Sequence, residues 1–309
     1  MNLDLTDLRL LVRTAELGSL TQAAAANHLS LAAASARIKG LETRAAQQLL
    51  VREARGVRLT QAGEAFVHHA RGMLRQAEQL RADLAEYSGG VRGHVRVLAN
   101  TTAVTDFLPE ILPGFLSAHP GVTVDLQEKP NADIARGVRD GRADLGIVAG
   151  PLDAAGLHAI HFSTDRLVLL VPRGHPFARR KRMDFAETLD EAHVGMHPGS
   201  TIHAFLAQEA ARLNRPLKLR IQLSGFDAMC RMIGAGVGVG VVPESAARRN
   251  LKGMGLVQIA LTDRWAVRER HVLVRETGAL PAYAQALVET LCAHYGRALN
   301  AAPGTPISP

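Results

Sequence analysis

The sequence predicts an α+β multi-domain protein, with an N-terminal winged helix-turn-helix, a long linker helix and a C-terminal α/β part. Three observations predict this arrangement. Two short helices with a tight break fit residues 18–42, a heptad pattern runs through residues 66–87, and short apolar runs alternate with helical segments from residue 94 onward. A chain of 309 residues also exceeds one typical core, so two or three domains are expected.

The boundaries follow these changes of pattern. Gly89, Gly90 and Gly93 end the heptad region and indicate a joint before the α/β part. The last nine residues, AAPGTPISP, have the composition of a disordered tail. The predicted parts are a winged helix-turn-helix (1–60), a dimerisation linker helix (61–90), an α/β part (91–300) and a disordered tail (301–309).

The N-terminal part begins with an amphipathic helix predicted for residues 4–16, which places its leucines on one face. A second helix is expected to begin at Ser19, whose hydroxyl can cap free N–H groups while Gln22 reaches back. Asn27 then ends the alanine run, and Ser30 is a natural N-cap for a third helix.

This third helix has an apolar row and an opposite side of small or polar residues without acids. The apolar row should face a core, and the opposite side can enter a DNA major groove without repelling phosphate. An alanine-rich helix pair fits an ordinary helical bundle equally well. The apolar row is Ala34, Ile38, Leu41 and Ala45, and the opposite side is Ala32, Ser35, Ala36, Lys39 and Thr43.

Residues 51–60, VREARGVRLT, predict a β-hairpin wing, because β-branched residues lie on both sides of Gly56. The wing and the helix before it carry six cationic side chains against two acids, Glu42 and Glu53, and this excess suits phosphate contacts. A solvated basic loop is the alternative interpretation. The six cations are Arg37, Lys39, Arg44, Arg52, Arg55 and Arg58.

Thr60 is expected to cap a long helix whose apolar residues follow a heptad seam for about three repeats. At roughly 1.5 Å per residue this helix is about 40 Å long. Two seams facing each other would pair two chains, so the pattern predicts a homodimer; packing onto the same chain is the alternative. The expected dimer contacts are Phe66, Met73, Leu80, Leu84 and Tyr87, with Ala70 and Ala77 completing the seam.

The α/β part contains seven strand-like runs that alternate with helical segments. Such alternation indicates a largely parallel sheet, and the number of strands indicates two lobes. The strand-like runs are HVRVLA, VTVDLQ, DLGIVA, RLVLLVP, HVGM, LKLRIQL and VGVVP, and the helical segments lie near 104–118, 131–140, 201–214, 226–236 and 280–298.

Composition narrows the class of protein. The formal charge of +7 and the isoelectric point near 10.0 favour contact with nucleic acid. The two cysteines, Cys230 and Cys292, indicate neither a disulfide framework nor a zinc site, and no metal or cofactor is expected. The N-terminus lacks a basic start and a long apolar run, and no stretch approaches a membrane span. We therefore expect a cytoplasmic protein without a membrane partner.

Several motifs occur in a specific order: GSLTQAAAANHLS, the mid-helix Ser35, IKGLE and VRLTQAG. Through them the chain resembles the LysR-type transcriptional regulators over nearly its whole length. Later AHPGVTVDL, GRADLGIV, VPRGHP and AGVGVGVVP resemble that family's effector domain, which is similar to a type 2 periplasmic binding protein. The resemblance implies a ligand-responsive regulator that binds double-stranded promoter DNA as a homodimer or homotetramer, bends it differently when a small effector binds, and has RNA polymerase as a candidate further partner.

The chain departs from the family pattern on the surface expected to contact DNA. Leu31 and Ala32 replace the usual Gln-Pro, and Ala36 replaces a common arginine. Sequence recognition is therefore expected to use fewer polar contacts, with methyl contacts to thymine and DNA shape contributing more. The expected DNA contacts are Ser30, Leu31, Ala32, Ser35, Ala36, Arg37, Lys39, Arg52, Arg55 and Arg58.

The resemblance also implies two lobes, residues 91–164 with 269–300 and residues 165–268, with an effector in the cleft between them. Hydroxyls and free N–H groups at helix starts favour an anionic effector such as a carboxylate, although plain helix capping is the alternative. The expected effector contacts are Asn100, Thr101, Thr102, His197, Ser200, Thr201 and Phe226.

A cytoplasmic α/β enzyme with an accessory helical domain is the alternative function. GAGVGVG at 234–240 approaches a dinucleotide fingerprint, but valine occupies 239 and 241, and the motif ends a helix before a strand. Ser200 lacks the glycine two residues later that a nucleophile elbow has, so no catalytic residue is predicted. A secreted binding protein is a third possibility, which the missing signal sequence and the N-terminal ninety residues disfavour.

Overall fold

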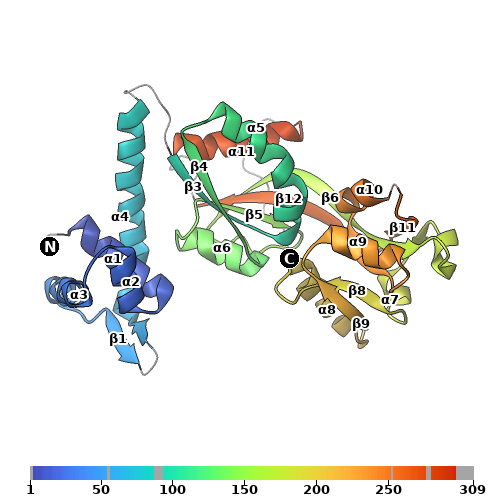
Figure 1. Ribbon diagram of the computed structural model, residues 1–309, viewed down its shortest axis with the longest axis horizontal. Coiled ribbons are helices and arrows are strands. Elements are labelled where there is room, and N and C mark those ends of the chain that lie inside the picture. The colour runs from blue at the N-terminus through green and yellow to red at the C-terminus, as the bar shows by residue number, and fades with distance from the viewer. Residues whose placement is uncertain (1–2, 54–55, 87–92, 252, 276–279, 297–309) are drawn as a thin grey trace. The chain divides into compact units, whose positions relative to one another are not determined.

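The computed structural model describes residues 3–53, 56–86, 93–251, 253–275 and 280–296 (Figure 1). The chain divides into two compact units, residues 1–91 with 140–142 and residues 92–139 with 143–309. The predictions for Arg55, Tyr87, the diglycine joint at 89–90 and the tail at 301–309 lie outside the described residues, as does the side chain of Arg52.

The first unit is the predicted winged helix-turn-helix followed by the long helix. Its helix starts are capped by the expected hydroxyls: the N–H of Gln22 donates to Ser19 at 3.3 Å, and that of Ala33 to Ser30 at 3.2 Å. The elements are α1 (Leu5–Leu17), α2 (Leu20–Ala26), α3 (Leu31–Ala45), β1 (Leu50–Glu53), β2 (Gly56–Leu59) and α4 (Gln61–Glu86).

One glycine fixes the wing against the helices. Gly56 has φ +130°, and a Cβ there would lie 2.3 Å from the carbonyl oxygen of Gly18. That oxygen also accepts a hydrogen bond from the N–H of Val57 at 3.0 Å. Only glycine allows this approach, so the wing is held to the turn between α1 and α2.

The core of this unit contains the predicted apolar row, since Ala34, Ile38 and Leu41 are buried. The same core includes Leu8 and Leu11 of α1 and Val67 and Ala70 of α4. Phe66 packs against it as well. The first half of α4 therefore packs onto its own chain, and Phe66, an expected dimer contact, takes part in this packing.

The first lobe of the second unit is a mixed sheet, which corrects the expectation of a largely parallel one. β3 pairs in parallel with β4 and β5, whereas β12 (Val267–Val274) is antiparallel to β5 and β6 (His158–Pro172). Figure 1 shows α5 and α11 on one side of this sheet and α6 on the other. The elements are β3 (Gly93–Ala99), η1 (Ala103–Phe107), α5 (Leu108–Ala118), β4 (Val122–Glu128), α6 (Asn131–Arg139), β5 (Leu145–Ala149) and α11 (Ala282–His294).

The second lobe surrounds one large apolar core that includes Phe185, Phe226 and Val242. Its strands β10 and β11 pair antiparallel with the far half of β6, and β8 pairs in parallel with β9 in a separate small sheet. The elements are η2 (Pro176–Arg179), β7 (Arg182–Met183), α7 (Phe185–Thr188), β8 (His193–Met196), α8 (Thr201–Arg212), β9 (Leu219–Leu223), α9 (Phe226–Gly234), β10 (Gly240–Pro243), α10 (Glu244–Asn250), β11 (Leu256–Leu261) and η3 (Arg264–Ala266).

Two long strands join the lobes. β6 (His158–Pro172) pairs with β12 (Val267–Val274) in the first lobe and continues into the second, where it pairs with β10 and β11. The sequence pattern missed β7, β11 and β12 and the first half of β6. The sequence of β12, VRERHVLV, contains too many charged residues to predict a central strand. Its arginines are nevertheless buried, through contacts that form only in the folded chain.

Candidate functional sites

The exposed side of α3 is poor in polar groups. Leu31, Ala32, Ala36 and Lys39 are exposed and Ser35 is half-buried, so the expected groove-facing side chains lie at the surface. Lys39 forms no ion pair with any described residue. Its ammonium group is therefore available to a phosphate, and the alanines and Leu31 offer apolar contact to thymine methyl groups.

Arg37, an expected DNA contact, forms ion pairs within the protein. Its guanidinium donates to Asp7 at 2.6 Å and to Asp4 at 3.1 Å, both at the start of α1. Arg44 donates to the second oxygen of Asp7 at 2.5 Å. The hydrogen bond to Asp7 raises the pKa of Arg37, so this side chain fastens α3 to α1 as a fully charged group.

The wing presents Arg58, whose side chain is 65% exposed. Its Nε donates to Glu53 on the opposite strand at 2.8 Å, a surface pair of small energetic weight. A phosphate can therefore compete for Arg58 at little cost.

From Met73 onward, α4 carries three large exposed apolar side chains. Met73, Leu80 and Leu84 are 41%, 59% and 58% exposed, and they belong to the predicted seam. Exposed leucines at heptad spacing on a helix of this length are typical of a surface that a second helix covers.

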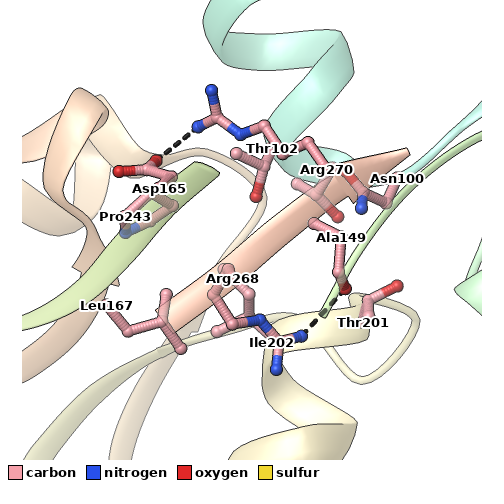
Figure 2. Close-up of a pocket in the computed structure, with 11 residues that line it drawn as sticks. Asn100, Thr102, Ala149, Asp165, Leu167, Thr201, Ile202, Pro243, Arg268 and Arg270 are labelled. Atoms are coloured by element: carbon pink, nitrogen blue, oxygen red, sulfur yellow. Dashed lines mark hydrogen bonds and ion pairs between the residues drawn. The ribbon is translucent and has the colours of Figure 1, made fainter. Parts of the chain in front are cut away.

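The cleft between the lobes brings together four of the expected effector residues. Asn100, Thr101 and Thr102 follow β3, Thr201 begins α8 in the other lobe, and all four line the cleft. Figure 2 shows Asn100, Thr102 and Thr201 in this lining. The enclosed space is about 20 Å³, which holds roughly one water molecule. The lobes must therefore separate before an organic molecule can enter.

Several polar side chains around this cleft already form hydrogen bonds within the protein. The Asn100 side chain caps the N–H of Ala103 at 3.0 Å and donates to Asn131 at 3.3 Å. Thr101 donates to Glu128 at 2.5 Å. These hydrogen bonds position the cleft wall, and they leave fewer side-chain groups for an effector than the sequence implied.

Near the start of α8, two polar contacts cross from one lobe to the other. Glu128 of β4 lies 3.3 Å from Nε2 of His197, which precedes α8. The N–H of Asn131 donates to the hydroxyl of Thr201 at 3.2 Å. His197, an expected effector contact, lies against Glu128 of the other lobe and is not among the residues that line the cleft.

Two further expected contacts are displaced. Phe226 is 2% exposed and belongs to the core of the second lobe, so the prediction that it packs on the effector is wrong. Ser200 is fully buried, and its hydroxyl neither caps α8 nor has a partner among the described residues. In the sequence, a large apolar residue that follows a glycine at a helix start is compatible with core packing and with an effector contact. The burial of Phe226 shows that it packs in the core.

Two arginines of β12 line the cleft, although the sequence pattern did not point to them. Arg268 and Arg270 are 4% and 3% exposed, and in Figure 2 they extend toward different partners. Arg270 forms an ion pair with Asp165, whereas Arg268 donates to the carbonyl oxygen of Ala149 at 3.0 Å. The only sequence signal is the alternation of arginines in an otherwise apolar strand, which does not distinguish a cleft-lining strand from a surface strand.

A second cavity shares Asp165 and Arg270 with the cleft. It is lined by an ionic network that joins the lobes: Arg249 of α10 pairs with Asp106, and the Ser245 hydroxyl lies 2.6 Å from Asp165 and also contacts Asp106. Burial raises the pKa of Asp106, although the nearby cations Arg249 and Arg270 act to lower it.

Comparisons with known proteins identify both parts of the chain. Residues 5–64 match the bacterial regulatory helix-turn-helix protein model of the lysR family, and residues 88–295 match the LysR substrate binding domain. The chain belongs to the LysR family of transcriptional regulators. This LysR-family chain is a ligand-responsive, DNA-binding transcriptional regulator and not an enzyme. The two matched models confirm the predicted family and fold class.

Individual relatives agree with this assignment. The regulator is 30% identical to the HTH-type transcriptional activator IlvY of Salmonella typhimurium strain LT2 over 258 residues, covering 78% of this chain and 83% of IlvY. It is 28% identical to a probable RuBisCO transcriptional regulator of Trieres chinensis over 256 residues, covering 80% of this chain and 83% of the relative.

Solved structures share the fold. A full-length OxyR variant from Pseudomonas aeruginosa aligns with a TM-score of 0.70 at 21% identity, covering 94% of this chain and 98% of OxyR. Full-length CbnR in complex with its target DNA aligns with a TM-score of 0.59 at 20% identity, covering 94% and 99%. The regulatory domain of CcmR from Synechocystis PCC6803, in complex with 2-PG, aligns with a TM-score of 0.58 at 23% identity, covering 66% and 98%.

Other kinds of site find no support in the described part of the regulator. No group of three or more His, Cys, Asp or Glu side chains there is arranged to hold a metal ion, and no helix there is long and apolar enough to cross a membrane. Cys230 and Cys292 are both buried, and burial raises the pKa of Cys230 to about 11. A thiol with so high a pKa is a poor nucleophile at neutral pH.

Proposed function

We propose that this regulator acts in the cytoplasm as a homodimer that pairs through the second half of α4 and assembles further into a homotetramer. Each α3 enters a major groove of promoter DNA, with Ser35 and Lys39 as its polar contacts. The wing arginines contact the phosphates on either side. The cleft binds a small organic anion, and closure of the lobes changes the bend of the DNA. RNA polymerase is a candidate partner of the bound assembly.

The observation that carries this proposal is the presence, on one chain, of an exposed helix-turn-helix surface and a two-lobed domain whose polar contacts cross a cleft. A ligand that binds both lobes favours the closed arrangement by its difference in affinity for the two arrangements. The exposed Met73, Leu80 and Leu84 support the dimer, since an uncovered apolar stripe of this kind is unusual on a monomer.

The test is a mobility-shift titration of the full-length protein with DNA taken from beside its own gene, repeated at rising salt concentration. We expect a specific shift at low salt that weakens steeply as salt rises, because cation–phosphate contacts release counterions. Failure to shift any such fragment at low salt, with the dimer intact by sedimentation, would refute the proposed function. Matched Leu80→Asp and Leu84→Asp variants should be monomeric and should lose most DNA affinity.

A further inference from the structure

Arg268 contributes to the cleft lining a buried nitrogen that has no hydrogen-bond acceptor among the described residues. Its Nη2 donates to the carbonyl oxygen of Ala149 at 3.0 Å, but its Nη1 is buried and has no acceptor among the described residues. A buried charged donor without an acceptor costs free energy, and such groups are rare in folded proteins. Something outside the described chain is therefore needed to satisfy it.

Arg270, two residues further along the same strand, provides an internal comparison. Arg270 is equally buried, and it pairs with Asp165, contacts Asp106 at 3.6 Å and donates to Ser245 at 3.0 Å. Arg268 has no carboxylate within ion-pair distance in the described residues. Glu209, the acid whose charge acts on Arg268, is itself bonded to Arg212 at 2.8 Å.

The guanidinium of Arg268 is held in place by its surroundings. It lies 4.3 Å from the ring centroid of Phe205, a cation–π arrangement. Gly150 has φ +81°, and a Cβ there would lie 2.0 Å from Cζ of Arg268, so glycine makes room for the guanidinium. A cation fixed in this way loses little conformational freedom when it binds an anion.

The lining residues around Arg268 can complete an anion site. Figure 2 shows Arg268 between Ala149 of one lobe and Thr201 and Ile202 of the other. Thr102, at the first helical turn after β3, also lines the cleft. Burial lowers the pKa of Arg268 to about 10, which still leaves the guanidinium charged at neutral pH.

We propose that Arg268 binds the acid group of the effector, so that the effector is a small molecule whose carboxylate or phosphate oxygen accepts hydrogen bonds from Nη1. This assignment rests on the proposed function of the cleft and adds the residue that fixes the charge of its ligand. Because the enclosed space is about 20 Å³, entry requires the Glu128–His197 and Asn131–Thr201 contacts to loosen. The anion then replaces these two contacts on this side of the cleft.

The fluorescence of the single tryptophan can report binding at this site. Trp265 is the single tryptophan of the chain, and its ring lies 5.2 Å from that of Phe205, which stacks on Arg268. We would titrate the full-length protein with acetate, pyruvate, oxalate and inorganic phosphate at constant ionic strength and follow Trp265 fluorescence and thermal stability. Acetamide, the neutral counterpart of acetate, is the ligand control.

We expect saturable binding of at least one of the four anions and none of acetamide. Arg268→Gln should weaken that binding about 10- to 100-fold, because a hydrogen bond to a charged group is lost. Arg268→Lys should keep part of it, since the charge remains without the planar fork. Arg264→Gln, an exposed arginine of the neighbouring η3, makes the same charge change and should bind like wild type.

The preferred anion separates the sources of the acid group: binding of carboxylates alone indicates an organic acid, and binding of phosphate alone indicates a phosphorylated effector. The assignment would be overturned if none of the four anions bound saturably at concentrations up to about 50 mM, which detects even millimolar affinity. Equal binding by wild type and Arg268→Gln would overturn it as well.

DNA mobility shift of the same preparations without added anion keeps the two proposals apart. A protein that shifts DNA but binds no anion refutes the role of Arg268 alone. A protein that shifts no DNA refutes the proposed function.

Discussion

Arg268 and Arg270 lie on the same strand with nearly equal burial, yet their electrostatic surroundings differ completely. Arg270 is surrounded by Asp106, Asp165 and Ser245, and Arg268 by a carbonyl oxygen and an aromatic ring. Burial of a paired cation is part of how the lobes are joined. Burial of a cation without a carboxylate suits a site whose counter-ion arrives with the ligand.

The DNA-binding unit contains the same contrast at its surface. Arg37 is bonded to Asp4 and Asp7, whereas Lys39, one half-turn further along α3, forms no ion pair with a described residue. In both units, a cation that lies near a ligand-binding surface is therefore not necessarily a ligand contact. Cations that are paired with carboxylates stabilise the fold, whereas cations without such a pair are available to a partner.

The largest test of this contrast compares two substitutions in β12. Arg270→Met should lower the free energy of unfolding by about 3–5 kcal/mol, because it removes the cation bonded to Asp165, whereas Asp106 keeps Arg249. Arg268→Met should stay within about 1 kcal/mol of wild type or increase stability, since it removes a cation without a carboxylate partner. Urea unfolding followed by Trp265 fluorescence measures both. Equal losses in the two variants would mean that the chain already satisfies Arg268.

A second test uses pH. Burial raises the pKa of Asp106, so the folded protein binds this proton more tightly than the unfolded chain does. The resulting stabilisation is complete below the ordinary aspartate pKa near 4 and is lost as pH rises through the raised pKa. Each tenfold difference in proton affinity between the folded and unfolded states contributes about 1.4 kcal/mol.

The Ser245 hydroxyl gives a structural reason for the same direction. It contacts both Asp106 and Asp165 but has one hydrogen to donate, so the second contact favours a protonated carboxyl. Unfolding free energies of wild type and Asp106→Asn, measured between about pH 4 and 7, should diverge, with wild type losing more as pH rises. Parallel curves would show that Asp106 stays ionised throughout.

The smallest expected effect concerns DNA. Lys39→Ala should weaken binding to all sequences by a similar factor and reduce the slope of log affinity against log salt by about one, because one phosphate contact is lost. Arg37→Met should leave that slope unchanged and lower the thermal stability of the N-terminal unit. If Lys39→Ala left affinity untouched while Arg37→Met reduced the slope, the roles assigned to the two cations would be reversed.

The local structure of the N-terminal unit was recoverable from sequence because its signals are local. Ser19, Ser30 and Thr60 cap the helices they were expected to cap, and Ala34, Ile38 and Leu41 face the core. Helix caps act within three residues, and an apolar row is periodic along one helix. The heptad spacing does not state which surface covers each position, and Phe66 packs against the core of its own unit.

In the effector unit the sequence determined the strand–helix alternation, and the order of motifs determined the family. Only the tertiary structure decided which polar groups remain for a ligand. In the structure Phe226 lies in the core and Thr101 is bonded to Glu128. Arg268 lines the cleft from β12, a strand that the sequence pattern did not predict. A capping hydroxyl is fixed by its own neighbours in the chain, whereas the pairing of a buried charge depends on residues up to a hundred or more positions away, brought together when the two lobes fold around β6 and β12.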